Sequence, residues 1–464
     1  MYINKIKYRR IAEICFSIGT TLLLGCTSIP TMVPDMAIMR SHPTQLEGTH
    51  GPLTFQQSKD IITKIKKNGE KTNIFDRHLA LETEIVGIPL VVGNKVELLV
   101  DGPMTYDSMF AAIENAKDHV NMETFIIEND EIGQRFSKEL IRKQNAGIQV
   151  NLIYDSVGSL NTPRDFFKTL TDSGINVLEY NPINPLIVRK DWQVNQRDHR
   201  KLLIIDGKTA FVGGINISSV YSNGSFGQSN KTKNEQPWRD THLRIDGPVV
   251  SDFQNIFMET WGKQNGKPLA AKNYFPKLSY KGKEVVRAIG SSPKEPYSQI
   301  YVTLISAINS AETNIFITNA YFIPDEKLIS ALSQAVKRGV EVRLLLPDKT
   351  DSTMVFHASR SYYDELLTAG IEIYEREDAL LHAKTAVIDG VWSTIGSTNL
   401  DWRSFTNNQE INAVVLGQSF GTQMQTMFEN DLVLSKRITL EFWRGRSFGA
   451  RIKESAARIW ARLL

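Results

Sequence analysis

Cysteine is nearly absent from this chain. Only two of the 464 residues are cysteines, Cys15 and Cys26, so the remainder of the chain has neither disulfides nor thiolate metal sites. Long apolar runs are missing too, because after residue 30 none approaches the roughly 18 residues of a membrane-spanning helix. With 41% hydrophobic residues and ordinary glycine and proline contents, the chain is neither disordered nor fibrous. We expect a water-soluble body long enough for two or three domains.

Outside the first 25 residues, the chain has no excess of either positive or negative charge. The whole chain has 54 Lys and Arg against 51 Asp and Glu, a net charge of +3. Residues 1–25 hold four basic residues and only one acidic residue, Glu13, so they account for the entire excess. A neutral remainder disfavours a protein that binds long nucleic acids, where clustered positive charge is usual.

The first residues are typical of an export signal. A basic segment ending at Arg10 precedes an apolar stretch over residues 14–24. Residues 23–26 resemble the lipobox of bacterial lipoproteins, in which the chain is cleaved before the cysteine, here Cys26, and the cysteine is acylated. The resemblance implies a lipid-anchored protein of the bacterial cell envelope that faces the periplasm, and Thr27 favours the outer membrane. An uncleaved anchor and an ordinary cleaved signal are the alternatives.

The rest of the chain divides by composition and by repetition. Residues 26–70 are rich in proline, threonine, serine and glutamine, which predicts a tether leading into a short helix. A helix, an apolar strand, an amphipathic helix, a glycine and a buried strand then occur twice in that order. We expect a first lobe over 71–270, a second lobe over 271–435 and a tail over 436–464. Strands that alternate with helices of about 10 to 15 residues predict two α/β lobes with mostly parallel or mixed sheets.

The strongest sign of duplication is a constant offset of 183 residues between chemically reactive side chains. The motif is His-x-Lys-x4-Asp, followed by Gly-x2-Asn, and each copy includes an apolar strand. The residues that recur are His199, Lys201, Asp206, Gly213 and Asn216, with His382, Lys384, Asp389, Gly396 and Asn399 as their counterparts. Five matches at one offset are not accidental.

The repeated motif supplies two histidines and two lysines. Alternate side chains of a strand share a face, so His199 lies on the same side as Lys201, and His382 on the same side as Lys384. Histidine can attack phosphorus or transfer a proton, and lysine neutralises phosphate oxygens, so the set suits a phosphodiester. A lone histidine or lysine of this kind is more often structural, but duplication reverses that expectation.

Each motif ends with an aspartate directly before a glycine, and these aspartates are Asp206 and Asp389. A carboxylate in that position is typical of a turn closed by local hydrogen bonds. We therefore expect both aspartates to be structural and to take no direct part in chemistry.

These motifs, with Gly213-Gly214-Ile215-Asn216 and Gly396-Ser397-Thr398-Asn399, resemble the phospholipase D superfamily over roughly residues 75 to 440. Four further segments resemble the bacterial cardiolipin synthase branch of that superfamily. They are Arg77-His78-Leu79-Ala80-Leu81, Trp238-Arg239-Asp240-Thr241-His242, Asn319-Ala320-Tyr321-Phe322-Ile323-Pro324 and Asn399-Leu400-Asp401-Trp402-Arg403-Ser404.

The resemblance implies one active site between two α/β lobes and a two-step transfer that needs no metal. By resemblance His199 is the nucleophile and His382 the acid and base, although the sequence alone leaves their order open. The motif residues counted as catalytic are His199, Lys201, Asp206, His382, Lys384 and Asp389; Asn216, Ser397 and Asn399 are implied to bind substrate. Asp240 in the first half and Glu410 in the second are implied to orient the histidines.

Two departures from a symmetric pair of motifs stand out. Gly214 occupies the position that Ser397 has in the second copy, so the first half lacks a hydroxyl near the phosphate. The segment from Tyr221 to Pro237 interrupts the first copy and is either an access loop or a solvated insertion. His242 and His357 have no partner at metal-ligand spacing, so we predict no metal and no cofactor.

The tail is basic and amphipathic. Residues 436–464 hold eight Lys and Arg against two Glu, a net charge of +6. At helical spacing one face carries Ile452, Ala456, Ile459, Trp460 and Leu463. Such a helix either lies on an anionic bilayer or docks on the second lobe with a charged outer face.

We expect a phosphatidyltransferase of the cardiolipin synthase type acting on anionic phospholipids such as phosphatidylglycerol at a membrane surface. The nearest alternative is a phospholipase D that uses water as acceptor, since acceptor choice depends on water exclusion. A nuclease and a non-catalytic lipid-binding protein are further alternatives. The neutral body disfavours nucleic acid, and the sequence leaves open whether the chain is a monomer or an oligomer.

Overall fold

The computed structural model describes residues 44–67, 74–75, 78–79, 87–183, 193, 195–222 and 237–463. The predicted signal, Cys26, Thr27 and most of the predicted tether lie outside these ranges, as do residues 223–236 of the insertion. Within them, β1 (Leu46–Gly48) already pairs in parallel with the first long strand, and α2 (Phe55–Lys67) is the short helix expected at the end of the tether.

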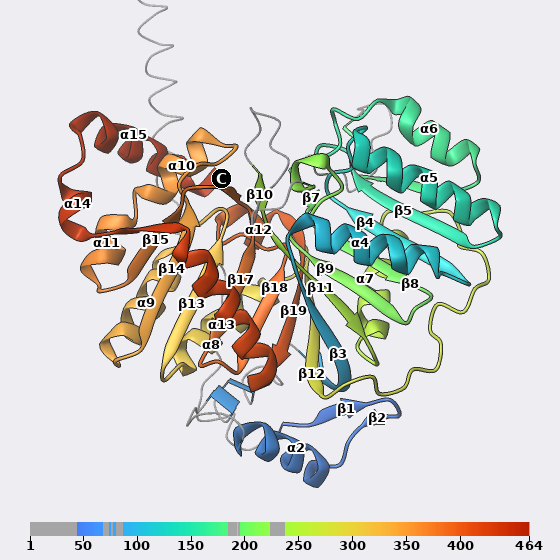
Figure 1. Cartoon of the computed structure of the whole chain (residues 1–464), viewed down its shortest axis with the longest axis horizontal. Helices are drawn as coiled ribbons and strands as arrows, with labels where there is room; N and C mark the ends of the chain where they lie inside the picture. The colour runs from blue at the N-terminus through green and yellow to red at the C-terminus, as the bar shows by residue number, and fades with distance from the viewer. Residues whose placement is uncertain are drawn as a thin grey trace, which may run out of the picture.

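One continuous sheet runs through both lobes (Figure 1). At its centre β3 (Leu90–Val100) pairs antiparallel with β12 (Glu284–Ser291). From β3 the first lobe continues through β11 (Thr241–Asp246), β9 (Thr209–Gly213), β8 (Lys201–Ile205), β4 (His119–Thr124), β5 (Gln149–Asp155) and β6 (Asn176–Tyr180). From β12 the second lobe continues through β19 (Asn408–Leu416), β18 (Trp392–Gly396), β17 (Lys384–Ile388), β13 (Asn314–Asn319), β14 (Glu341–Pro347), β15 (Glu372–Arg376) and β20 (Ser435–Ile438). The prediction of two similar α/β lobes is confirmed.

The sheet is mixed, which the prediction of mostly parallel or mixed sheets included. Among the longer strands, β4–β5–β6 and β13–β14–β15 run parallel, and the central strands are antiparallel. The reason lies in the motif itself, because Asp-Gly turns join β8 to β9 and β17 to β18. Asp206 and Gly207 have φ of 54° and 62°, and Asp389 and Gly390 have 51° and 60°. Two successive residues in this region make a tight hairpin, which can join only antiparallel strands.

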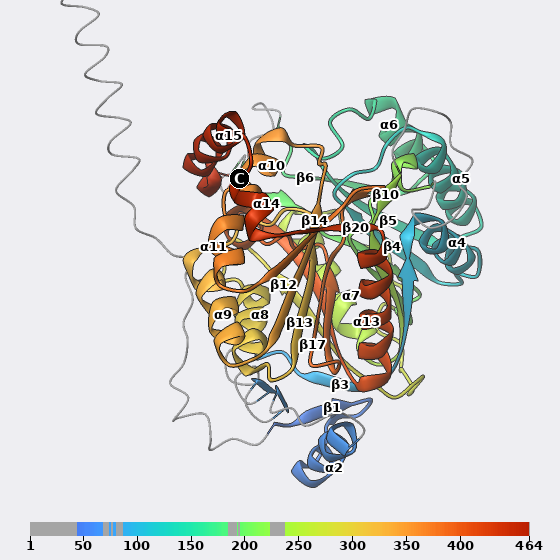
Figure 2. The same cartoon turned by 60° about the vertical axis from the view of Figure 1, so that its left-hand side comes forward.

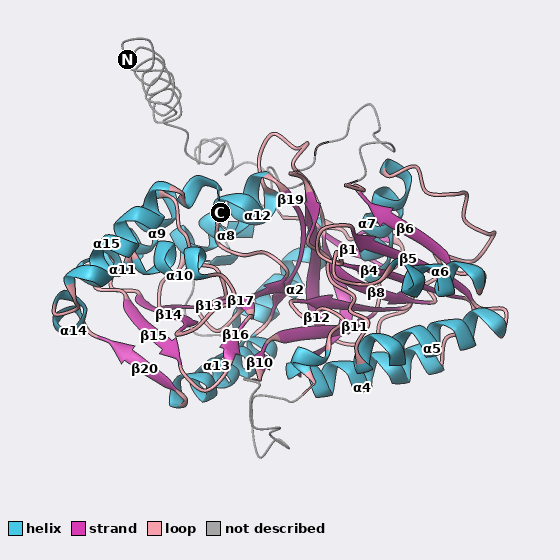
Figure 3. Ribbon diagram, turned by 90° about the horizontal axis from the view of Figure 1, so that it is seen from above, coloured by secondary structure: helices cyan, strands magenta, loops and turns pink. Residues whose placement is uncertain are grey.

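Helices cover both faces of the sheet (Figures 1 and 3). In the first lobe α4 (Asp101–Glu114), α5 (Glu131–Asn145) and α6 (Arg164–Asp172) share one core, and in the second α8 (Gln299–Ser310), α9 (Glu326–Lys337) and α11 (Tyr363–Thr368) share another. A third core joins the lobes through α7 (Val250–Lys263) and α13 (Gln418–Val433), whose Phe253, Phe257, Met424 and Phe428 are all buried.

The amphipathic helix after the first strand begins in the same way in both lobes. Asp130 accepts a hydrogen bond from the backbone of Gly133 at the start of α5, and Asp325 accepts one from Leu328 at the start of α9. A carboxylate at this position satisfies a backbone N–H that the helix leaves without a partner. The repeated cap shows that the duplication extends to local structure outside the catalytic motifs.

The tail docks on the second lobe. After β20 it forms α14 (Leu440–Arg444), α15 (Phe448–Ile459) and the short helix η4 (Ala461–Leu463), which pack on α10 (Thr353–Arg360), α11 and α12 (Trp402–Thr406). Docking was one of the two predicted placements. The outward face carries charged residues, but it also carries large apolar ones: Ile452 is 53% exposed and Ile459 is 69% exposed.

None of the helices in the described ranges combines the length and the apolar character that crossing a bilayer requires.

Candidate active site

The two motifs meet between the lobes. Lys201 is the first residue of β8 and Lys384 the first residue of β17, and each histidine precedes its lysine by two residues. All four side chains are almost fully buried, with His199 8% and His382 6% exposed. The charges of Lys201, Lys384 and His382 all lower the pKa of His199, after burial itself, so the two halves of the site act on one another directly.

Each histidine is held by a carboxylate from the other half of the chain. The Nδ1 atom of His199 lies 3.0 Å from Oε2 of Glu410, and Nδ1 of His382 lies 2.6 Å from Oδ2 of Asp240. The two carboxylates named from the sequence are therefore at the histidines. Their pairing crosses the lobes, whereas the sequence associated each with the histidine of its own half.

Short parallel strand pairs explain the crossed arrangement. β7 (Arg197–Asp198) pairs with the start of β19, and the backbone N–H of His199 donates to Gln409, the residue before Glu410. Likewise β10 (Trp238–Arg239) pairs with β16 (Leu380–Leu381), and the backbone N–H of His382 donates to Arg239, the residue before Asp240. Each histidine is thus placed by the strand that carries its partner carboxylate.

The two carboxylates differ in environment. Burial raises the pKa of Glu410 to about 7, against the opposing charge of Lys201 and hydrogen bonds that include one from Ser397. Burial also acts to raise the pKa of Asp240, but the hydrogen bond and charge of His382, with the charge of Lys384, outweigh it and the pKa is lowered. Asp240 is therefore the more firmly ionised of the two carboxylates.

Gly214 and Ser397 occupy equivalent positions in the two motifs, and each lies next to one of these carboxylates. A Cβ at Gly214 would lie 2.2 Å from Oδ1 of Asp240, so a side chain there would displace that carboxylate. In the other half the hydroxyl of Ser397 donates to Oε2 of Glu410 at 2.5 Å and accepts from the backbone of Ile411 at 3.0 Å. Ser397 is fully buried, and its hydroxyl contacts Glu410 and the backbone of Ile411.

Both lysines are held by the backbone of their own motif. Nζ of Lys201 donates to the carbonyl of His199, and Nζ of Lys384 donates to the carbonyl of His382. Burial lowers the pKa of Lys201 to about 7 and that of Lys384 to about 8, although Glu410 and Asp240 act in the other direction. Two crowded ammonium groups of this kind favour an anion between them.

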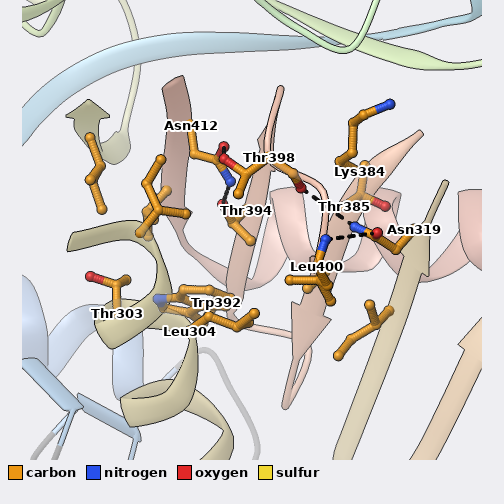
Figure 4. A pocket seen from close by; sticks show the side chains of 15 residues that line it. Thr303, Leu304, Asn319, Lys384, Thr385, Trp392, Thr394, Thr398, Leu400 and Asn412 are labelled. Carbon is orange, nitrogen blue, oxygen red and sulfur yellow. Dashed lines mark hydrogen bonds between the residues drawn. The ribbon is translucent and has the colours of Figure 1, made fainter. Parts of the chain in front are cut away.

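The motif asparagines are buried beside the site. Oδ1 of Asn216 accepts from the backbone of Ile126 at 3.2 Å, and its Nδ2 donates to Tyr221 at 3.2 Å. Asn399 is 4% exposed. The side-chain amide of Asn319 holds the residues on either side of Asn399, because its Nδ2 donates to the carbonyl of Thr398 and its Oδ1 accepts from the backbone N–H of Leu400 (Figure 4).

A small cavity lies directly beside Lys384 in the second lobe (Figure 4). Its walls come from α8 and from the sheet and include Thr303, Trp392 and Thr394. The indole N–H of Trp392 and the hydroxyl of Thr303 are buried there without a hydrogen-bond partner. A narrow cavity with unpaired polar groups suits water rather than a lipid, so we do not assign it to substrate.

Aromatic side chains that the sequence analysis did not single out surround the histidines. The hydroxyl of Tyr221 lies 3.3 Å from Nδ1 of His382, and the ring of Trp238 lies 5.2 Å from the His382 ring. Phe125 packs edge-on against His199 with 5.0 Å between ring centres. Trp238 was detectable in principle, because it precedes Asp240 by two residues on an extended segment. Phe125 and Tyr221 had no such signal.

The motif aspartates are structural, but their contacts are not local. Asp206 accepts hydrogen bonds from the backbone of Lys117, Asp118 and His119, and Asp389 from the backbone of residues 312–314. Each carboxylate thus ties its hairpin turn to the segment that leads from a helix into β4 or β13. This end of the strands is opposite to the histidines.

Within the described ranges, no group of three or more His, Asp or Glu side chains is arranged to hold a metal ion.

Comparison with known proteins gives consistent results. The family described as cardiolipin synthase, PLD-like domain, matches residues 109–234 and 304–432, one copy in each lobe. A cardiolipin synthase of Listeria monocytogenes is 36% identical over 381 residues, covering 82% of this chain and 77% of that protein. A cardiolipin synthase of Geobacillus kaustophilus is 35% identical over 378 residues, covering 81% and 74%.

A solved structure shares the fold. Phosphatidylserine synthase of Haemophilus influenzae superposes with a TM-score of 0.59 at 14% sequence identity, over 82% of this chain and 99% of that one. At that identity the likeness concerns the fold alone. Two domain copies and relatives that align over most of both chains show that this chain belongs to the cardiolipin synthase family of PLD-like proteins.

Proposed function

We propose that the protein is a phosphatidyltransferase of the cardiolipin synthase type, which moves a phosphatidyl group from one phospholipid to the hydroxyl of another. The observation that carries the proposal is the pair of crossed histidine–carboxylate contacts with two lysines close to the histidines. Fixed imidazoles and ammonium groups in one buried site suit nucleophilic attack on phosphorus followed by proton transfer. The names of the related proteins support the same reaction.

The reaction has two displacements. In the first, Nε2 of His199 attacks phosphorus, the bond from phosphorus to the head-alcohol oxygen breaks, and His382 donates a proton to that oxygen. In the second, His382 takes the proton of the acceptor hydroxyl, whose oxygen attacks phosphorus and breaks the phosphorus–nitrogen bond. Glu410 and Asp240 each accept a hydrogen bond from Nδ1, which leaves Nε2 available in both rings.

The different environments of the histidines support this assignment of roles. A nucleophile must be neutral, and burial with the charges of Lys201 and Lys384 places the pKa of His199 well below its usual range. The pKa of His382 is also lowered, by burial and then by Lys384, but the Asp240 contact opposes that shift. His382 therefore retains a proton more readily, as a general acid must.

We assign phosphate binding to Lys201, Lys384, Asn216 and Asn399. The lysines supply the positive charge that a phosphodiester and its transition state require. The Oδ1 atom of Asn399 is buried without a partner, and turning the amide would present its N–H2 to the same space.

The test is product analysis with purified protein and phosphatidylglycerol vesicles, beside His199→Ala and His382→Ala variants. Cardiolipin and glycerol in equal amounts, absent with both variants, are expected. Phosphatidic acid as the main product would show that water is the acceptor and would overturn the transferase proposal. Turnover that survives in the variants would remove these histidines from the mechanism.

We further propose that the protein is anchored in the bacterial envelope by acylation of Cys26 and faces the periplasm. The lipobox-like residues 23–26 support this. Expression with radiolabelled palmitate is expected to label the wild type and not Cys26→Ser. Equal labelling of the two would contradict the anchor.

A further inference from the structure

The tail helix α15 rests on the second lobe by its small and polar side. Its buried residues are Glu454 and Ala457, followed by Ala461 in η4, and Glu454 pairs with Arg446 at 2.8 Å. The opposite side carries the large apolar residues, here called the tail patch: Phe448, Ile452, Ile459 and Trp460, which are 78%, 53%, 69% and 52% exposed.

This orientation is the reverse of an ordinary surface helix. A helix docked on a globular core turns its apolar stripe inward, because apolar surface left in water forgoes roughly 25 cal/mol per Å². Here the stripe is displayed although the second lobe lies directly beneath the helix. Clustered apolar residues that a fold leaves on its surface mark a place where something else binds.

The tail patch lies at the active-site end of the molecule. η4 packs on α12, and α12 begins directly after Asp401, two residues beyond the motif Asn399. Figures 1 and 2 both show α15 and α10 at the end that carries β10, with α2 at the opposite end.

A second exposed apolar group lies on the other lobe. The loop between β5 and α6 presents Val157 at 39% and Leu160 at 66% exposure, here called the loop patch. The hydroxyl of Ser159 in that loop donates to the carbonyl of Phe125, the residue whose ring packs on His199. Viewed from above, α15 and α6 lie on either side of the strands that carry the site (Figure 3).

The charge around the tail patch is complementary to anionic lipid. The tail has a net charge of +6, and Arg451 and Lys453 are exposed on α15 itself. Arg444 and Arg458 pair with Asp364 and Glu365 of α11 at the contact between the tail and the second lobe. An amphipathic helix with arginine, lysine and an exposed tryptophan suits the interface of a bilayer.

We propose that the tail patch and the loop patch together place the protein on an anionic bilayer, with the end of the molecule that carries β10 and α10 facing the lipid. The inference rests on the proposed function to the extent that the substrate is a lipid of that bilayer. It goes further in naming which residues touch the membrane and in what orientation the protein sits.

A fluorescent probe tests the orientation in the full chain with Cys15 and Cys26 replaced by serine. NBD attached to Ile459→Cys or Leu160→Cys is expected to shift to the blue and brighten several-fold with vesicles of phosphatidylcholine and phosphatidylglycerol. The same probe on Phe55→Cys is the matched control, because Phe55 is 56% exposed in α2 at the far end. An equal response at all three positions, or none at 459 and 160, would overturn the proposal.

Activity provides the second arm. Ile452→Ser combined with Trp460→Ser is expected to lower turnover of vesicle phosphatidylglycerol at least fivefold, with little change when the lipid is dispersed in detergent micelles. Phe55→Ser with Phe275→Ser removes comparable exposed surface elsewhere and is expected to change neither rate. Equal loss on vesicles and micelles would refute an interfacial role.

The outcomes separate this inference from the reaction proposed above. If NBD at position 459 enters the bilayer while no lipid is turned over, the membrane-binding inference is supported and the proposed reaction is refuted. If the wild type is a dimer that the double serine variant dissociates, and the probe does not respond to lipid, the patch binds a second copy of the chain and the membrane inference fails.

Discussion

Two histidines of identical motif position have different surroundings, and the difference originates in single residues. Asp240 approaches His382 closely because Gly214 has no side chain, and it remains ionised because His382 and Lys384 are beside it. Burial raises the pKa of Glu410 to about 7, although Ser397 and Asn408 donate hydrogen bonds to its carboxylate. A histidine held by the first carboxylate is better suited to carry a proton.

Asp240→Asn is expected to remove the general acid. Without the carboxylate the pKa of buried His382 falls further, so turnover of phosphatidylglycerol is expected to drop about 10²- to 10⁴-fold. In a donor lipid whose head alcohol is p-nitrophenol, the leaving group departs without being protonated. The Asp240→Asn variant is therefore expected to recover most of its rate with that donor. Glu410→Gln acts on the nucleophile instead and is not expected to be rescued; rescue of both variants to the same extent would contradict the assignment.

The lysines predict a pH dependence of anion binding. The pKa of Lys201 is lowered from 10.5 to about 7 and that of Lys384 to about 8, so both are charged below pH 7 and lose their protons as the pH rises to 9. Affinity for dimethyl phosphate, which keeps one negative charge over this range, is expected to fall about tenfold or more from pH 6.5 to 9. Titration followed by NMR would measure it, and Lys201→Met is expected to flatten the dependence; a flat wild-type profile would refute it.

At the scale of elements, the hairpin that carries each histidine is fastened at its far end. The carboxylates of Asp206 and Asp389 each receive backbone hydrogen bonds from three consecutive residues of a neighbouring segment. Bonds to a charged acceptor are stronger than neutral ones, and removing the acceptor leaves several donors unpaired.

Asp206→Ala and Asp389→Ala are each expected to destabilise the protein by about 2–4 kcal/mol, since three backbone N–H groups, most of them partly buried, lose a charged acceptor. Urea unfolding followed by circular dichroism would measure the effect. The folded fraction is expected to keep a near-normal turnover number, because neither aspartate touches the histidines. Asp172→Ala, at an exposed i,i+4 pair with Lys168, is the control and should change stability little. Loss of turnover without loss of stability would reassign the aspartates to chemistry.

The same elements show how far the sequence could predict the site. The offset of 183 residues located the histidines and the lysines, because covalent spacing and strand period are local properties, and the family resemblance supplied the two carboxylates. The offset could not show that Glu410 belongs to His199, since that pairing depends on β7 lying beside β19. The hydrogen bond from Ser397 to Glu410 could not be predicted for a related reason, because the direction of a side chain across a sheet depends on register. The Asp-Gly dipeptides carry a hairpin signal, which indicates the antiparallel part of the mixed sheet in each lobe.

At the scale of the whole molecule, the lobes are locked together by a buried charge cluster next to the site. Arg239, from the first half, makes two hydrogen bonds with the carboxylate of Asp431 in α13, at 3.0 and 2.8 Å. Arg376, from β15, bonds the same carboxylate. All three side chains are at most 1% exposed, and Arg239 is also the residue whose backbone carbonyl accepts from His382. The cluster therefore links the junction of the lobes to the position of the general acid.

Asp431→Asn is expected to weaken both stability and catalysis. It leaves two buried guanidinium groups facing a neutral amide, and breaking a buried pair in this way costs about 3–5 kcal/mol. Because Arg239 is displaced along with β10, Asp240 moves relative to His382 and turnover is expected to fall at least tenfold in the protein that remains folded. Glu429→Gln lies on the same helix at an exposed pair with Arg343 and is expected to alter neither quantity. Asp431→Glu keeps the charge and is expected to recover stability more than turnover, because the longer side chain restores neutralisation but not the position of β10. A wild-type urea midpoint in Asp431→Asn would show that the lobes are held together by the shared sheet and the α7–α13 core alone.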